Sequence, residues 1–402
     1  MAATSPFWIY DGPSGLWKHR DGRSLQPGSG PDPELPPLYA GHQAFVLRVG
    51  MNAVDNKSNP NTTPRPQYDE AVQLCGLQLN QMTTRRLFNS GLVTTTALNN
   101  MIAEPDATPG QQAVLSFKIP AAGWITILSG AYDAQLLIIR NWAKARMAAS
   151  KMPVMITFNH EPTGDGPTGN NTTDMGHWGR MQVYCLNYLT GWASRGYGNT
   201  GGTYDAANDV REGVVWTSIS NGHWWGERAG QPALIAAAYP QYHIDAFADR
   251  GGPMGTDIYD PNLDGGLTVS YDANNDRIEN TITFRNNPYN SCNGELTNML
   301  SWARSNGVKC IGFGEMGNVT RTNYDKTINL LMDNRDIVTY CCIFNNVQNS
   351  KWNWNHVPAN YPAYNGVVNE FLTDYGGDAL SAAYITKFQT LVSRSETERD
   401  PF

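Results

Sequence analysis

The sequence predicts an α/β fold, and within that class a (β/α)8 TIM barrel with an N-terminal arm and extended loops. The 402 residues are enough for a barrel of about 250 residues with long insertions. Short apolar runs alternate with stretches of helical periodicity, which is typical of repeated βα units. The runs are apolar almost throughout, as expected of parallel strands that are buried on both faces.

Eight strand positions are expected in chain order. Residues 1–37 precede them as an N-terminal arm that ends in a Gly-, Pro- and Ser-rich linker at 21–37, and residues 38–402 are expected to form the barrel domain. The predicted strands are 43–50, 83–89, 112–119, 153–159, 214–220, a sixth position covering 244–248 and 255–259, then 308–314 and 337–344. Helical spacing of apolar residues predicts helices at 133–149, 292–306 and 324–335.

Composition and charge exclude several classes of function. The formal net charge is -7, and no basic stripe is present, so electrostatically driven binding of nucleic acid is not expected. The longest apolar stretch, around 233–239, is far shorter than the roughly 20 residues of a membrane helix. The first residues lack the basic start and apolar run of a classical signal peptide. An extracellular or virion-associated protein that leaves the cell by another route is the expectation.

No cofactor or metal is expected. The six cysteines form no C-x-x-C pair, and Cys310, Cys341 and Cys342 lie in apolar runs that predict buried thiols. No glycine-rich dinucleotide motif follows the first strand, and no phosphate-binding loop occurs. The acidic segment 272–276 lacks the later glycine and glutamate of an EF-hand loop, so a polar turn is predicted there.

Two glutamates stand where a barrel enzyme places its chemistry, at the carboxyl ends of the strands. Glu161 follows the fourth predicted strand, and Glu315 follows the seventh. These strands lie on opposite sides of an eight-strand ring, so both side chains are able to reach one point above the barrel. A pair of carboxyl groups of this kind is what the cleavage of a glycosidic bond requires. The structural alternative is that each glutamate caps a helix or pairs with an arginine.

The ordered motifs resemble glycoside hydrolase family 26, the β-mannanase-like retaining enzymes. The matching pieces run in family order over roughly residues 43–346 and are His160-Glu161, Val214-Val-Trp216, Tyr239-Pro240 with Asp245 after it, Gly255-Thr-Asp-Ile-Tyr259 and Gly314-Glu315. The resemblance implies that Glu161 is the general acid/base and Glu315 the nucleophile. It also implies that His160 contacts the sugar and that Tyr259 hydrogen-bonds the nucleophile.

Further substrate contacts are expected from aromatic residues and one arginine. Trp224 and Trp225 follow the fifth strand, and Trp178 follows the loop after Glu161, so their indole faces are candidates for stacking on sugar rings. Trp216 matches the strand-five motif, with a core position as its alternative. Arg86 is a candidate for keeping a catalytic carboxylate ionised, and an ordinary surface pair with Arg85 is the other reading. Trp352 and Trp354 form a third aromatic cluster.

The sequence therefore predicts a retaining glycoside hydrolase that cleaves a β-linked polysaccharide, either mannan-like or an envelope glycan. The long segment 162–175 after Glu161 departs from the family pattern, as does the insertion 249–254. These departures leave the sugar open. The alternative is a non-catalytic carbohydrate-binding structural component, for example a phage tail-associated protein, whose N-terminal arm docks onto an assembly partner.

Overall fold

The computed structural model describes most of residues 47–346, three short strands between residues 8 and 25, and residues 389 and 392. The longer gaps within 47–346 are 55–81, 193–203, 227–230, 260–291 and 318–320. Among the expected features, Trp352, Trp354, the segment 272–276 and the side chain of Tyr259 lie outside the described part.

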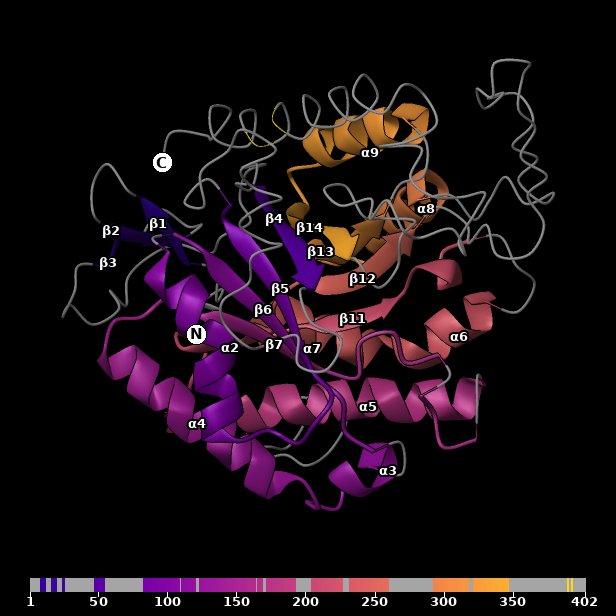
Figure 1. Cartoon of the computed structure of the whole chain (residues 1–402). Coiled ribbons are helices and arrows are strands. Elements are labelled where there is room, and N and C mark those ends of the chain that lie inside the picture. The colour runs from indigo at the N-terminus through magenta and orange to yellow at the C-terminus, as the bar shows by residue number, and fades with distance from the viewer. Residues whose placement is uncertain are drawn as a thin grey trace, which may run out of the picture.

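The main sheet is a nearly closed barrel of parallel strands (Figure 1). In spatial order its strands are β10 (Val214–Trp216), β7 (Val154–Phe158), β6 (Gln112–Phe117), β5 (Thr84–Asn89), β4 (Arg48–Val54), β14 (Val338–Asn346), β13 (Ile311–Gly317), β12 (Met254–Tyr259) and β11 (Ser218–Asn221). Consecutive members of this order pair in parallel.

One residue closes the ring. β10 pairs with β7 and β11 pairs with β12, and only Thr217 separates β10 from β11 in the chain. The Thr217 amide donates to Ile156 O at 3.0 Å, and its hydroxyl donates to Pro253 O just before β12. β10 and β11 are thus one barrel position with a break in the middle. The predicted (β/α)8 barrel is confirmed.

The predicted strand positions hold, with one error. The first and seventh strands lie a few residues further along the chain than expected, at 48–54 and 311–317. The segment 244–248 is not a strand, because it belongs to helix α7 (Gln241–Arg250). Its buried residues His243, Ile244 and Phe247 repeat at helical spacing, and a short, mostly apolar segment such as 244–248 does not by itself distinguish a buried helix from a strand.

Helices surround the strands. The three predicted helices are confirmed as α4 (Asp133–Ala148), α8 (Cys292–Ser305) and α9 (Arg321–Asp333). The others are α2 (Thr95–Ala107), α3 (Gly123–Ile127), α5 (Thr172–Leu189), α6 (Gln231–Ala238), α7 and the short 3-10 helix η2 (Gly222–Trp224). α4 and α5 lie on one side of the barrel, and α8 and α9 lie on the opposite side (Figure 1). No helix in the described segments is long and apolar enough to cross a membrane.

Two small antiparallel sheets lie outside the barrel strands. β1 (Trp8–Asp11), β2 (Leu16–His19) and β3 (Ser24–Leu25) form one of them within the N-terminal arm, so part of the Gly- and Pro-rich linker does pair as a strand. β8 (Thr190–Trp192) and β9 (Tyr204–Asp209) form the other, directly after α5.

The barrel interior is a separate small apolar cluster. It contains Val114, Met155, Val215, Ile219, Cys310, Tyr340 and Cys342, whereas the large cluster between strands and helices contains Ala113, Leu115 and most other core residues. Adjacent residues of β6 therefore face opposite sides, as the pleat of a strand requires. Cys310, Cys341 and Cys342 are buried thiols, which confirms the sequence-based prediction.

Two glycines on α5 give a matched test of this packing. A Cβ on Gly179 would lie 2.1 Å from Ala238 O of α6, whereas a Cβ on Gly176 would have only Ala237 O nearby, at 3.9 Å. We expect Gly179→Ala to lower the free energy of unfolding by about 1–3 kcal/mol, because the backbone of α6 must move. Gly176→Ala should raise it by up to about 1 kcal/mol, because alanine favours the helix. Urea denaturation measures both, and equal effects would contradict the packing described.

Candidate active site

Glu161 is presented by a strained turn directly after β7. Asn159 and Glu161 both have positive φ angles, 45° and 52°, which are uncommon for residues other than glycine. The Asn159 side chain accepts a hydrogen bond from Ile119 N and donates one to Ile119 O, each at 3.1 Å. The backbone N–H of Asn159 donates to Phe117 O at 2.8 Å. The Glu161 amide donates to Ile219 O at 3.2 Å. The turn is thus fixed to the ends of β6 and β11, and the strain is maintained by these bonds.

Aromatic residues hold the same turn from outside. Trp178 on α5 donates through Nε1 to Asn159 O at 2.9 Å, and Trp224 donates to the hydroxyl of Thr163 at 2.7 Å. Thr163 N in turn donates to Asn221 Oδ1 at 2.8 Å. Both indoles are buried and pack edge-to-face against each other. They position the loop that carries Glu161.

Glu315 owes its orientation to a bulge in β13. Along β12 and β13, Thr256 pairs with Phe313, but the next pair is Asp257 with Glu315, so Gly314 is skipped. Such a bulge shifts the inward and outward alternation by one residue. Without it, Gly314 would occupy the position beside Asp257 and Glu315 would face the helices. Instead the Glu315 side chain lies on the same face as that of Asp257, buried at 5% exposure.

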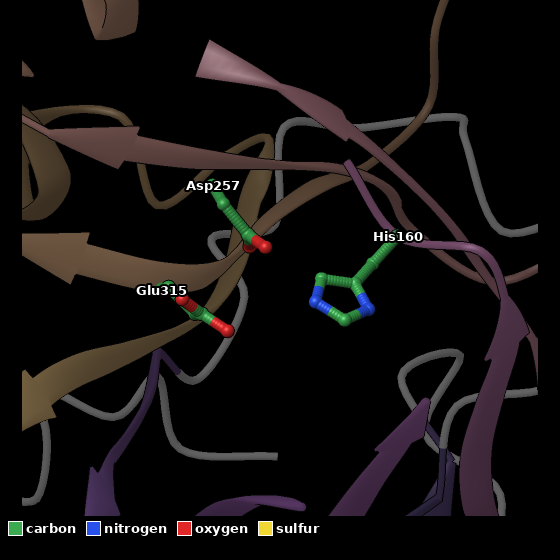
Figure 2. A group of neighbouring side chains, drawn as sticks. All are labelled: His160, Asp257 and Glu315. Atoms are coloured by element: carbon green, nitrogen blue, oxygen red, sulfur yellow. The ribbon is translucent and has the colours of Figure 1, made fainter. Parts of the chain in front are cut away.

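Asp257 completes a cluster that the sequence did not reveal as a site. The carboxylates of Asp257 and Glu315 and the imidazole of His160 offer atoms that all lie within 4.8 Å of one another. Figure 2 shows the two carboxylates on neighbouring strands with the imidazole facing them from the other side of the space. Asp257 stood in the quoted Gly255–Tyr259 motif, but only its final tyrosine was assigned a role. The signal in the sequence that could have identified Asp257 is an acidic residue within an otherwise apolar strand.

Arg86 is the cation beneath this cluster. Its guanidinium is fully buried and stacks 4.9 Å from the Phe88 ring centroid, and Phe88 stacks on His160 at 5.1 Å. A Cβ on Gly314 would lie 2.6 Å from Asp257 Oδ1 and 3.2 Å from Arg86 Nε, so only a glycine leaves room for both groups there. Arg85, its neighbour on β5, instead pairs with Glu104 of α2. The surface-pair reading of the two arginines is therefore wrong, because both are buried.

Burial and mutual repulsion raise the proton affinity of two of the acids. Burial, and after it the charge of Glu315, raises the pKa of Glu161 to about 8, against the opposing effect of Lys118 and Arg86. The pKa of Asp257 is raised well above its ordinary value by burial and then by Glu315, while Arg86 opposes the rise. Burial, assisted by Arg86 and Lys118, lowers the pKa of His160, so its imidazole is neutral at pH 7. Glu161 is therefore protonated at neutral pH, and the proton affinity of Asp257 beside Glu315 is raised.

The cluster of His160, Asp257 and Glu315 has residue types that bind metals, but its surroundings do not favour a cation. The charge of the buried Arg86 already acts on His160, Asp257 and Glu161. A second cation among these groups would repel the guanidinium in a site of low dielectric constant. We therefore assign no metal ligands here.

The expected stacking of tryptophans on sugar rings is not what the structure shows. Trp178, Trp216, Trp224 and Trp225 are at most 2% exposed, and each indole N–H donates to a protein acceptor, that of Trp216 to Gln182 and that of Trp225 to Ser220. Their prediction as substrate contacts is wrong for this structure, because the same area that suits a sugar also suits the core between barrel and helices. Trp216 is a core residue, which was the alternative interpretation of this position from the sequence.

An apolar pocket of about 690 Å³ lies outside the barrel, between η2, α6, α7 and α8. Its lining includes Trp225, Tyr239, Pro240, Ile244 and Trp302. Trp224 lines it as well, and this residue also donates to Thr163 in the loop after Glu161. His160, Glu161, Asp257, Glu315 and Arg86 do not line the pocket.

No family model and no curated protein matches the chain. Solved structures with a similar chain path include an endo-beta-1,4-mannanase double mutant from Cellulomonas fimi, with 15% identity, a TM-score of 0.47 and coverage of 85% of this chain and 70% of that one. GH5_18 from Streptomyces cattleya in complex with GlcNAc is 13% identical, with a TM-score of 0.46 and coverage of 89% and 82%. The tri-modular endo-beta-1,4-glucanase B from Bacillus halodurans is 13% identical, with a TM-score of 0.43 and coverage of 76% and 56%.

Asn159 provides a test of the strained turn. Asn159→Ala removes both side-chain bonds to Ile119 and places a Cβ-bearing residue without compensation at φ 45°. We expect a loss of about 2–4 kcal/mol in the free energy of unfolding. Asn159→Gly loses the same bonds but tolerates the angle, so it should be more stable than the alanine variant by about 1 kcal/mol. Urea denaturation compares them, and an alanine variant as stable as the glycine variant would show that the turn carries no strain.

Proposed function

We propose that the protein is a retaining glycoside hydrolase that cleaves β-linked polysaccharide, with Glu161 as general acid/base and Glu315 as nucleophile. One observation carries the proposal: glutamates from two barrel strands that are not neighbours act on each other in one site, and the charge of Glu315 helps keep Glu161 protonated. Two carboxyl groups with separated proton affinities are the arrangement that glycosidic cleavage requires.

The reaction follows from the two protonation states. Glu161, protonated at pH 7, donates its proton to the glycosidic oxygen, so the leaving sugar departs as a neutral alcohol. A Glu315 carboxylate attacks the anomeric carbon and forms a covalent glycosyl-enzyme intermediate. The Glu161 carboxylate then takes a proton from water, which displaces Glu315 and regenerates both groups. Arg86 supplies a fixed positive charge beneath the acids throughout.

His160 and Asp257 have supporting roles in this proposal. The neutral imidazole of His160 faces the carboxylates from the Glu161 turn, where it is placed to hydrogen-bond a sugar hydroxyl. Asp257 lies beside Glu315 on the next strand, and in its protonated form it is able to donate a hydrogen bond to the attacking carboxylate. Mannan-like chains and envelope glycans are the proposed substrates, which places the proposed site of action outside the cell or on a virion.

Removing either glutamate should abolish turnover without unfolding the protein. We expect Glu315→Ala to lower kcat/KM on the order of 10³-fold or more, and Glu161→Gln about 10²–10⁴-fold. Release of reducing ends from mannans, mixed-linkage glucans, xylans and bacterial envelope polysaccharides measures both variants against the wild type. Full activity in Glu315→Ala would refute the assignment. Retention of the wild-type protein on a glycan with no release of reducing ends would favour the carbohydrate-binding alternative.

The basic side of the pH profile should report Glu161. Its pKa is raised to about 8, so the acid is protonated and competent below this value and loses its proton as the pH rises through it. We expect kcat/KM to fall about tenfold for each pH unit above roughly pH 8. Initial rates between pH 5 and pH 10 measure this limb. A limb near pH 5, where an unperturbed glutamic acid ionises, would show that Glu161 is not the acid.

A further inference from the structure

The loop that follows Glu161 is joined to the barrel by an ion pair. Lys118 Nζ lies 2.9 Å from Asp165 Oδ2. Lys118 comes directly after β6, where its amide donates to Asn89 O at 3.2 Å, and Asp165 N donates to Pro162 O at 3.0 Å. The pair therefore connects the carboxyl end of β6 with the turn that carries Glu161. Its acidic member, Asp165, lies within the segment 162–175.

The pair lies at the rim of the site. The side chain of Lys118 is 43% exposed, and that of Asp165 is 27% exposed. An exposed ion pair of this kind typically adds less than about 1 kcal/mol to stability. Overall stability is therefore a poor explanation for it. Its position next to the proposed acid is the more informative feature.

Charged groups reach Glu161 from every side. Glu315 faces it from β13, Arg86 from β5, Lys118 from the end of β6, Asp257 from β12 and Asp165 from its own loop. Glu315, Asp257 and Arg86 are buried groups of the site itself. Lys118 and Asp165 are the members of this set that are joined to each other, and their charges have opposite signs.

We propose that Lys118 and Asp165 form a positioning pair for Glu161: the ion pair holds the acid-bearing turn against the end of β6 and places one charge of each sign beside the Glu161 carboxyl. The role of this pair in catalysis rests on the proposed function. The effect of the two charges on Glu161 does not rest on it, because it is a property of the protein without substrate. The positive charge of Lys118 favours the ionised form of Glu161, and the negative charge of Asp165 favours the protonated form.

Because the charges of Lys118 and Asp165 have opposite signs, removing one or the other should shift the pKa of Glu161 in opposite directions. Lys118→Met removes the positive charge, so the pKa of Glu161 should rise, whereas Asp165→Asn removes the negative charge and should lower it. Each shift is expected to be roughly half a pH unit, as for a solvent-screened charge several ångströms away. The double variant should return close to the wild type. Lys118→Arg keeps the charge and should behave like the wild type.

The measurement is a ¹³C NMR titration of glutamate-labelled protein, with the Glu161 signal assigned by its loss in Glu161→Gln. Lys151→Met is the matched control, since Lys151 is an exposed lysine before the opposite end of β7 and is expected to cause no shift. The basic limb of kcat/KM is measured on the same proteins. If the ion pair served only to hold the loop in place, both single variants would lose activity equally, and the pKa of Glu161 would shift in the same direction in both.

The two proposals fail in different ways. Shifts of opposite sign in the two single variants support the positioning pair, even if no polysaccharide is hydrolysed. Shifts of the same sign, or none, overturn it, even if the enzyme is fully active. Absence of hydrolysis across the polysaccharide panel overturns the proposed function alone.

Discussion

The crowding of three carboxyl groups around one buried guanidinium is the constraint on which the site depends. Glu161, Asp257 and Glu315 repel one another in their ionised forms, and the buried Arg86 is a cation that acts on both Glu161 and Asp257. All three acids cannot be ionised together in such a space. The protonated state of Glu161, which the proposed acid catalysis requires, therefore follows from burial and from its neighbours.

The barrel creates this crowding by bringing strand ends together. β7 and β13 lie three strand positions apart in the ring, yet the turn after β7 and the bulge in β13 direct Glu161 and Glu315 toward the same space. Both features cost free energy locally. The turn contains residues with positive φ angles, and the bulge interrupts the pairing register of β13. Asn159, Trp178 and Gly314 provide the hydrogen bonds and the room that make them tolerable.

The tryptophans illustrate why residue type alone does not identify a binding surface. A large indole is suited both to stacking on sugars and to filling the layer between a barrel and its helices. Here Trp178 and Trp224 are buried, and their N–H groups are used by the Glu161 loop. Their contribution to the proposed activity is therefore indirect, through the position of the acid.

The sequence by itself determined the barrel and its two glutamates, because apolar periodicity and strand-end position are local properties of the chain. It did not determine that 244–248 is helical, since a short, mostly apolar segment is compatible with a buried helix or a buried strand. Asp257 and the inward orientation of Glu315 were decided by the tertiary structure, through the pairing of β12 with β13 and the residue skipped at Gly314. The same holds for Arg86, whose burial depends on which face of β5 meets the interior. Which face points inward is a property of the closed ring, and no single segment of the sequence encodes it.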